Sequence, residues 1–133
     1  MPALDTNILV RLLVEDDPRQ MAAALNLVER AAREARALFV PLTVALELEW
    51  VLRSRYRFPK DVVLTTFSAL LETQELEFQD EAAMETALYL YRQQQADFAE
   101  CLHLGCALAH GSAPLITFDQ SAARLAGAQL LES

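Results

Sequence analysis

The chain has 133 residues, of which 53% are hydrophobic and 23% are charged, and its formal net charge is −8. These values predict one globular domain over residues 1–133 with a single core, and they exclude a disordered chain. The sequence has neither an apolar run long enough to span a bilayer nor a secretory leader, so we expect a cytoplasmic protein without membrane attachment.

The first informative stretch lies near the N-terminus, where a short apolar run meets polar side chains. Pro2–Leu4 is typical of a strand, Asp5, Thr6 and Asn7 follow, and apolar residues then recur at helical spacing over 8–13. If the strand belongs to a parallel sheet, Asp5 lies at its carboxyl end, where open α/β sheets bind ligands. The alternative is that Asp5 or Thr6 only caps the following helix.

A second helix is predicted after Asp16-Asp17-Pro18, because aspartate caps helices and proline is tolerated at their first position. Its apolar stripe comprises Met21, Leu25, Val28 and Ala32. The run 37–40 then predicts a short buried strand, which Pro41 ends.

A third helix is predicted from Thr43 to Arg55, with an apolar stripe made of Val44, Leu48, Val51 and Leu52. Glu47 falls inside this stripe, and a core-facing carboxylate needs a partner or a cation. Glu49 falls on the opposite side, where Arg53 can pair with it. We therefore expect Glu49 to be a solvated surface charge.

The segment from Arg53 to Lys60 is the most basic part of the chain. Its cations are Arg53, Arg55, Arg57 and Lys60, with Tyr56 and Phe58 between them. The simplest interpretation is a solvated helix end. The functional interpretation is a contact for RNA phosphates or for an acidic partner, with the two rings available for stacking. The net acidity of the chain argues against backbone binding by bulk charge, but a local basic patch can reverse the field.

The second half of the chain repeats the pattern of strands and helices. A helix over 60–71, a weak strand over 75–78 and a helix over 80–95 lead to a nearly apolar helix over 97–110. Asp97 and Glu100 are three residues apart and share a face of that last helix. Asp-x-x-Glu also resembles a capping box, and both interpretations can hold together.

The C-terminal part repeats the arrangement seen at Asp5. Gly111 is predicted to end the helix, and a strand over 115–118 is followed at once by Asp119, a helical run and a last strand over 129–131. Alternating strands and helices predict an α/β fold with a mainly parallel sheet.

Five carboxylates stand at strand ends or on helix faces: Asp5, Glu47, Asp97, Glu100 and Asp119. Converging carboxylates repel one another, so they come together only where cations neutralise them. Oxygen-only ligands select Mg²⁺ or Mn²⁺, and such ions could activate a water for in-line displacement at a phosphodiester. Cys101 and Cys106 have no basic neighbour and are predicted to be unpaired core residues.

Four motifs occur in an order and spacing that point to one family. They are Leu4–Leu9, Leu46–Leu52, Ala96–Leu104 and Thr117–Asp119. Together they resemble the PIN domain family, most of all the VapC toxins of toxin–antitoxin pairs, and the likeness runs through essentially the whole chain. It implies a three-layer α/β/α domain around a central, mainly parallel twisted sheet. It also implies an Mg²⁺- or Mn²⁺-dependent endoribonuclease that is held inactive by a VapB-like antitoxin and forms a homodimer.

The resemblance also assigns roles by position. Asp5, Glu47 and Asp119 match the acidic catalytic and metal-binding residues, whereas Thr6, Asn7 and Thr117 match the polar positions that order the site. Members of the family usually have aspartate at position 100, often with a second at position 97. Either Asp97 is therefore the main ligand here, or Glu100 reaches the metal through a different rotamer.

Two other classes of function remain open on the sequence. Glu100 in place of aspartate is compatible with a PIN-like binding module that has weakened catalysis and acts through a protein partner. A phosphatase with an aspartate nucleophile is disfavoured, because such enzymes place a second carboxylate two residues after the first and Asn7 stands there.

Overall fold

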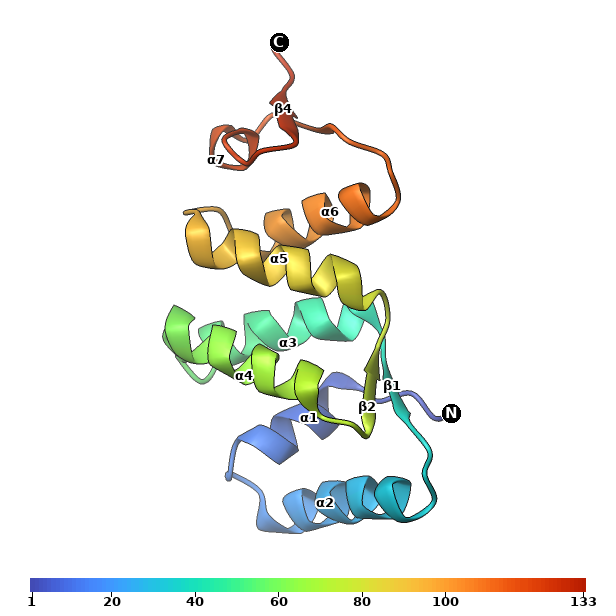
Figure 1. Cartoon of the computed structure of the whole chain (residues 1–133). Coiled ribbons are helices and arrows are strands. Elements are labelled where there is room, and N and C mark those ends of the chain that lie inside the picture. Colours follow the sequence, from blue (N-terminus) through green and yellow to red (C-terminus); the bar gives the residue numbers. More distant parts are fainter. The chain divides into compact units, whose positions relative to one another are not determined.

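The computed structural model describes all 133 residues and divides them into two compact units, Met1–Gln79 and Asp80–Ser133. Each unit is described by itself. Figure 1 shows that both units combine helices with short strands. None of the helices has the length and apolar composition that a bilayer-spanning segment needs.

The N-terminal unit contains four helices and one pair of strands. Its elements are α1 (Thr6–Leu13), α2 (Pro18–Arg33), β1 (Leu38–Val40), α3 (Leu42–Ser54), α4 (Lys60–Glu72) and β2 (Leu76–Phe78). Strands β1 and β2 are parallel, with Leu38 opposite Leu76. The predicted first strand is reduced to a single parallel bridge between Ala3 and Phe39. Two backbone hydrogen bonds, from Leu4 to Phe39 and from Phe39 to Pro2, hold this bridge.

The C-terminal unit is built around a pair of closely packed helices. Its elements are α5 (Glu81–Gln93), α6 (Phe98–Ala109), β3 (Leu115–Thr117), α7 (Gln120–Ala123) and β4 (Ala128–Leu130). Strands β3 and β4 are also parallel. Gly105 of α6 faces the backbone of α5 so closely that an added Cβ would lie 2.5 Å from the Ala83 carbonyl oxygen. The Tyr91 and Phe98 rings meet edge to face, with their centroids 5.4 Å apart.

Helix α6 ends as the sequence predicts, at a glycine in the left-handed region. Gly111 has φ of 72°, a conformation that disfavours residues with a Cβ. The N–H groups of Gly111 and Ser112 donate to the carbonyls of Leu108 and Ala107. This pair of hydrogen bonds is the Schellman arrangement, which satisfies the last carbonyls of the helix.

The predicted α/β class with parallel strands is confirmed, but the orientation expected for α3 is wrong. Its buried residues are Ala45, Leu48, Glu49 and Leu52. Glu49, expected in solvent, is 2% exposed, whereas Glu47, expected to face the core, is exposed. The buried face of α3 includes Ala45 and not the larger Val44 and Val51. The prediction missed this because a small alanine contributes little to an apolar stripe.

The apolar stripe predicted for α2 is also only partly buried. Leu25 remains 42% exposed. It lies with Val28 along a mainly apolar groove of about 600 Å³, whose other walls are α1 and α4. The buried face of α2 is instead marked by Ala24 and Ala31.

Candidate functional site

In the N-terminal unit, two of the predicted acids, Asp5 and Glu47, both accept hydrogen bonds from Thr6. The Asp5 side chain accepts a hydrogen bond from the Thr6 backbone N–H at 2.8 Å. The Thr6 hydroxyl donates to the Glu47 carboxylate on α3. Thr6 is 4% exposed, whereas both carboxylates are exposed. A buried hydroxyl therefore holds Glu47 beside the start of α1, while the free oxygens of both acids face solvent.

Asp5 also has the structural role that the sequence left open, since it is the N-cap of α1. The chain reaches it from the Ala3 bridge to β1, so Asp5 follows a strand-like segment and precedes a helix. Asn7 is exposed on the first turn of α1, and its side chain makes no hydrogen bond within the protein. The cap and a role in a polar site are compatible, because only one of the Asp5 oxygens bonds to the helix.

In the C-terminal unit, Asp97 and Glu100 form the capping box that their spacing predicts. Glu100 accepts a hydrogen bond from the Asp97 backbone N–H at 3.2 Å. Asp97 is exposed and Glu100 is half-buried. The longer glutamate side chain is thus used to close the first turn of α6, which leaves Asp97 as the more accessible of the two acids.

Asp119 repeats the arrangement at Asp5 in the same unit. It follows β3, caps α7 and accepts a hydrogen bond from the Ala122 N–H at 2.9 Å. The Thr117 hydroxyl accepts a hydrogen bond from the Asp119 N–H at 3.0 Å, which fixes the turn between strand and helix. Thr117 therefore orders the backbone of the acid, as Thr6 orders the carboxylate of Glu47.

Capping alone does not distinguish these acids from others in the chain. Five helices begin at an aspartate N-cap: Asp5, Asp17, Asp80, Asp97 and Asp119. Asp5, Asp80 and Asp119 differ from Asp17 and Asp97, because each of these three follows a strand or a strand-like bridge with one residue between. The carboxyl end of a strand is where α/β proteins bind ligands, so position in the fold favours these three caps. Of the three, only Asp5 and Asp119 also belong to the sequence motifs described above.

The donors of the N-terminal unit suit a hard divalent cation. Asp5 and Glu47 offer only carboxylate oxygens, the ligands that Mg²⁺ and Mn²⁺ prefer. Neither unit on its own gathers three or more His, Cys, Asp or Glu side chains into a metal-binding group. The C-terminal unit contributes oxygen donors of the same kind at Asp97, Glu100 and Asp119. The chemistry of the donor set therefore fits the expected ion.

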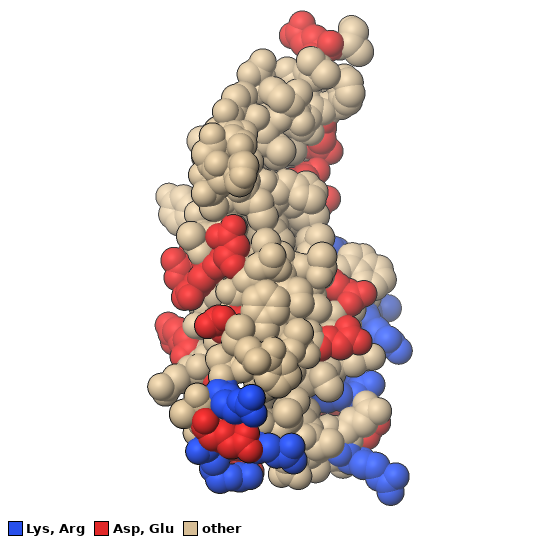
Figure 2. Space-filling model, turned by 90° about the vertical axis from the view of Figure 1, so that its right-hand side faces the viewer, with Lys and Arg blue, Asp and Glu red and all other residues tan.

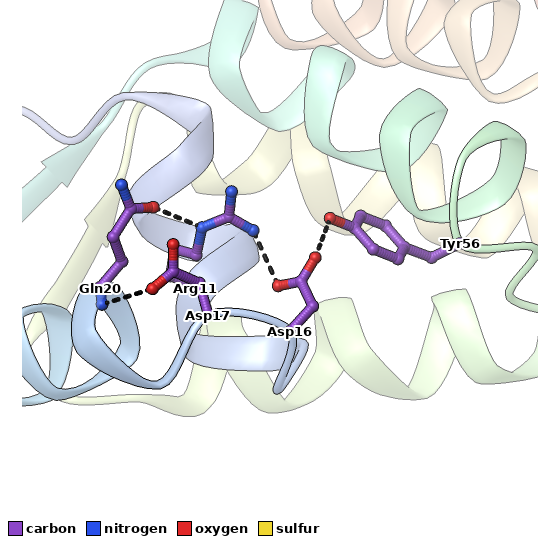
Figure 3. A network of polar contacts seen from close by, with 5 residues as sticks. All are labelled: Arg11, Asp16, Asp17, Gln20 and Tyr56. Atoms are coloured by element: carbon purple, nitrogen blue, oxygen red, sulfur yellow. Dashed lines mark hydrogen bonds and ion pairs between the residues drawn. The ribbon is translucent and has the colours of Figure 1, made fainter.

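The basic segment is fixed by a polar network that the sequence did not reveal. Figure 3 shows the Asp16 carboxylate between Tyr56 and Arg11. The Tyr56 hydroxyl donates to Asp16 Oδ2 at 2.8 Å, and Arg11 Nη1 lies 2.8 Å from Asp16 Oδ1. The pKa of Asp16 is lowered chiefly by the Tyr56 hydrogen bond; desolvation acts in the opposite direction, and the Arg11 charge lowers the pKa further. The Asp-Asp-Pro pattern predicts only a helix cap, which Asp17 provides.

The four cations of the basic segment are not equivalent. Arg53 Nε lies 2.8 Å from Glu49 Oε2 in an ion pair whose carboxylate is buried. Lys60 is half-buried at the start of α4. Arg55 and Arg57 are exposed, and the structure gives neither of them a carboxylate partner. Among the predicted contact residues, Arg55 and Arg57 are therefore the ones presented to solvent without an ion pair.

The two cysteines are free, as predicted. Cys101 is buried, and Cys106 is half-buried. Burial, with a smaller contribution from the Asp80 charge, raises the pKa of the Cys106 thiol. Both cysteines are thus poor nucleophiles, and the candidate chemistry belongs to the carboxylates.

Comparison with known families gives one match. The family model described as PIN domain matches residues 3–128, a range that contains every acid considered above. No curated protein matches the chain significantly.

Proposed function

Because the chain belongs to the PIN domain family, we propose that it is a metal-dependent endoribonuclease of the VapC toxin type. PIN domains are generally nucleases, that is, hydrolases acting on phosphodiester bonds, and they are typically dependent on divalent metals. The observation that carries the proposal is the hydrogen-bonded junction of Asp5, Thr6 and Glu47 inside the matched range. A buried hydroxyl that holds an exposed carboxylate beside another is an arrangement suited to cation binding.

We infer that residues 1–133 act as one PIN-like domain. The family match begins at residue 3 and ends at residue 128, so it spans both compact units. On this proposal Asp97, Glu100 and Asp119 act with Asp5 and Glu47 as the catalytic and metal-binding set. Asp97 is the better candidate for a direct ligand in its pair, because Glu100 closes the capping box.

Mg²⁺, or Mn²⁺ in its place, would be held by these carboxylates. When bound, the cation supplies the Lewis acidity that activates water and offsets the charge of the phosphodiester undergoing displacement. The residues of the chain bind the cation and orient its ligands. Thr6 keeps Glu47 at the start of α1, Thr117 fixes the turn that carries Asp119, and Asn7 offers an exposed amide on α1.

The likeness to VapC toxins supports two further proposals about partners. A VapB-like antitoxin would hold the enzyme inactive, and the enzyme would form a homodimer. RNA is the proposed substrate. Size-exclusion chromatography with light scattering tests the homodimer, since a monomer over a wide concentration range would overturn that part of the proposal.

The second candidate is a PIN-like binding module with weakened catalysis. The observation in its favour is the use of Glu100 in a structural capping box where family members usually have aspartate. Glu100→Asp separates the two functions. In an active enzyme this change alters the cleavage rate, whereas in a binding module neither form cleaves RNA.

The deciding experiment is cleavage of a mixed pool of structured RNAs by the full chain with Mg²⁺, with Mn²⁺ and with EDTA. Asp5→Asn is compared with the parent, and Asp17→Asn serves as the matched control because Asp17 is also an N-cap but caps α2. We expect metal-dependent cleavage that falls on the order of 100-fold or more in Asp5→Asn and persists in Asp17→Asn. Cleavage in EDTA, or equal activity of Asp5→Asn and the parent, would overturn the proposed site.

A further inference from the structure

The chain is acidic as a whole, but its positive charge is concentrated in one unit. Nine of the eleven lysines and arginines precede residue 80, and four of them lie between residues 53 and 60. In Figure 2 the blue side chains accordingly gather over the N-terminal unit. No acidic residue interrupts the run from Arg53 to Lys60. A local positive field can therefore exist on a protein whose net charge is −8.

The backbone of this segment has a defined conformation. After α3, the N–H groups of Arg55 and Tyr56 donate to the Val51 carbonyl, and the N–H of Phe58 donates to Leu52. Arg57 has φ of 58°, in the left-handed region that non-glycine residues seldom adopt. A non-glycine residue persists there only where its surroundings hold it. The exposed side chains of Arg55 and Arg57 thus project from a fixed turn.

A side-chain latch ties this turn to the loop between α1 and α2. Tyr56 is the residue between the two exposed arginines, and its hydroxyl donates to Asp16 at 2.8 Å (Figure 3). Asp16 is held from its other side by Arg11, whose Nε donates to Gln20 Oε1 at 2.6 Å. The latch therefore consists of Tyr56, Asp16, Arg11 and Gln20, and it joins α1, α2 and the end of α3.

Two of the three acidic groups of the neighbouring loop have internal partners. Asp16 is paired with Arg11, and Asp17 accepts the Gln20 N–H at 3.0 Å as the cap of α2. Glu49 is likewise engaged with Arg53. The carboxylates of Asp16, Asp17 and Glu49 thus have internal partners, whereas those of Glu15 and Asp61 are exposed. The guanidinium groups of Arg55 and Arg57 have no carboxylate partner and are available to an anionic ligand.

We propose that Arg55 and Arg57 bind phosphates of single-stranded RNA, and that the Tyr56–Asp16 latch is the positioning element that presents them. This inference rests on the proposed ribonuclease function and adds to it a substrate-binding surface outside the candidate metal site. Arginine suits the role because its planar fork of donors matches the geometry of a phosphate. Phosphate contacts of this kind supply affinity and position without reading sequence.

The test measures binding of the full chain to a fluorescein-labelled single-stranded RNA of mixed sequence. Fluorescence anisotropy is recorded in EDTA, from about 50 to 200 mM salt, so that cleavage does not interfere. The double variant Arg55→Ala/Arg57→Ala is expected to weaken binding on the order of 10-fold at low salt. It should also reduce the slope of log Kd against log salt by about 1.4, which corresponds to two phosphate contacts on a single strand.

The matched control removes the same charge elsewhere in the same unit. Arg30 and Arg33 are exposed near the end of α2 and have no ion pair. Arg30→Ala/Arg33→Ala should change Kd by no more than about twofold, because distant surface charges are screened. Equal effects of the two double variants would overturn the inference, since they would mean that only bulk charge matters.

The latch is tested by Tyr56→Phe, which keeps every charge and removes one hydroxyl. We expect a several-fold weaker Kd in the parent background and no further weakening in the Arg55→Ala/Arg57→Ala background, because the hydroxyl acts through these arginines. Tyr89→Phe, a change at an exposed tyrosine of the other unit, is the control. Additive effects of Tyr56→Phe and the double variant would refute a positioning role, because a general loss of stability acts in both backgrounds.

Two parallel measurements complete the test. RNA cleavage with Mg²⁺ is followed on the same proteins, which separates this inference from the proposed function. Binding to poly-glutamate is measured as well, which separates RNA from an acidic protein as the ligand of the surface. If the parent cleaves RNA but Arg55→Ala/Arg57→Ala binds RNA normally, the surface inference fails and the nuclease stands. If Arg55 and Arg57 govern RNA binding but no protein cleaves, the nuclease proposal fails and the surface stands. Absence of RNA binding by the parent, or binding of poly-glutamate with the same dependence on both arginines, would overturn the RNA surface.

Discussion

The Thr6 hydroxyl on α1 donates a hydrogen bond to the Glu47 carboxylate on α3, 41 residues further along the chain. Thr6 is 4% exposed and Glu47 is exposed, so the bond crosses from the interior to the surface of the N-terminal unit. The buried Thr6 hydroxyl therefore fixes the position of the exposed Glu47 carboxylate.

Thr6→Val, which keeps the shape of the side chain and removes the hydroxyl, should affect activity more than stability. Glu47 can hydrate when its partner is lost, so we expect the free energy of unfolding to fall by only about 1 kcal/mol. RNA cleavage should fall about 10- to 100-fold, the usual range for residues that orient metal ligands. Denaturant unfolding and cleavage kinetics measure the two effects. Thr6→Ser restores the donor and should recover most of the activity; failure of this recovery would contradict the role of the hydrogen bond.

Arg53→Ala should destabilise the fold because it removes an ion-pair partner of a buried carboxylate. The Glu49 side chain is 3% exposed and the Arg53 side chain 46% exposed, so solvent screens the arginine side of the pair. We therefore expect a loss of about 1–2 kcal/mol rather than the larger cost of breaking a fully buried pair. The control is Arg36→Ala, since Arg36 lies 3.8 Å from Glu34 and both side chains are largely exposed. Comparable losses in the two variants, measured by urea unfolding, would contradict the burial of Glu49 as the cause.

The stabilisation provided by the Tyr56–Asp16 hydrogen bond should depend on pH in the acidic range. The folded state lowers the pKa of Asp16, chiefly through the Tyr56 hydrogen bond and then through Arg11. This contribution is therefore complete above the unfolded pKa of about 4 and is lost as pH falls through the lower folded value. The difference in stability between the parent and Tyr56→Phe should be constant from about pH 5 to 7 and shrink below about pH 4. A difference that grows on acidification would have the wrong sign for a bond to the carboxylate.

Gly105→Ala should destabilise the C-terminal unit through steric conflict. The new Cβ would lie 2.5 Å from the Ala83 carbonyl oxygen, a backbone atom of the facing helix that cannot move aside alone. Overpacking of this kind costs about 1–3 kcal/mol. Gly111→Ala offers a contrasting control, because nothing lies within 4 Å of its Cβ and only the positive φ opposes it. A second-site change Ala83→Gly should not rescue Gly105→Ala, because the conflict involves the backbone of residue 83; rescue would point to a different cause.

The sequence predicted the elements and the strand-end acids because both depend on local signals. An apolar run followed by aspartate and a helical stripe identifies Asp5 and Asp119, and each is a helix cap that follows a bridge or a strand with one residue between. The two glutamates of α3 could not be assigned in this way. Their predicted orientation was wrong because the buried face is rotated by about 60° from the stripe of large apolar residues, toward the small Ala45. Such a rotation is set by packing against other elements and leaves no trace in the spacing.

The latch could not be predicted from the sequence, for a different physical reason. Asp16 and Asp17 are adjacent carboxylates before a proline, and either can cap α2 by its chemistry. Only the path of the chain places Asp16 beside Tyr56, which is 40 residues away. Contacts between side chains so distant in sequence follow from the fold and cannot be derived from the local pattern.

The position of Trp50 gives the protein a spectroscopic probe in a useful place. It is the only tryptophan, it is 58% exposed, and it lies on α3 three residues from both Glu47 and Arg53. Its indole is already largely hydrated in the native state, so its emission should change little on unfolding, and circular dichroism is the better signal for the stability comparisons. A nucleotide base that stacks on this ring would quench it. Tryptophan emission should therefore report the arrival of RNA on unlabelled protein, independently of any cleavage.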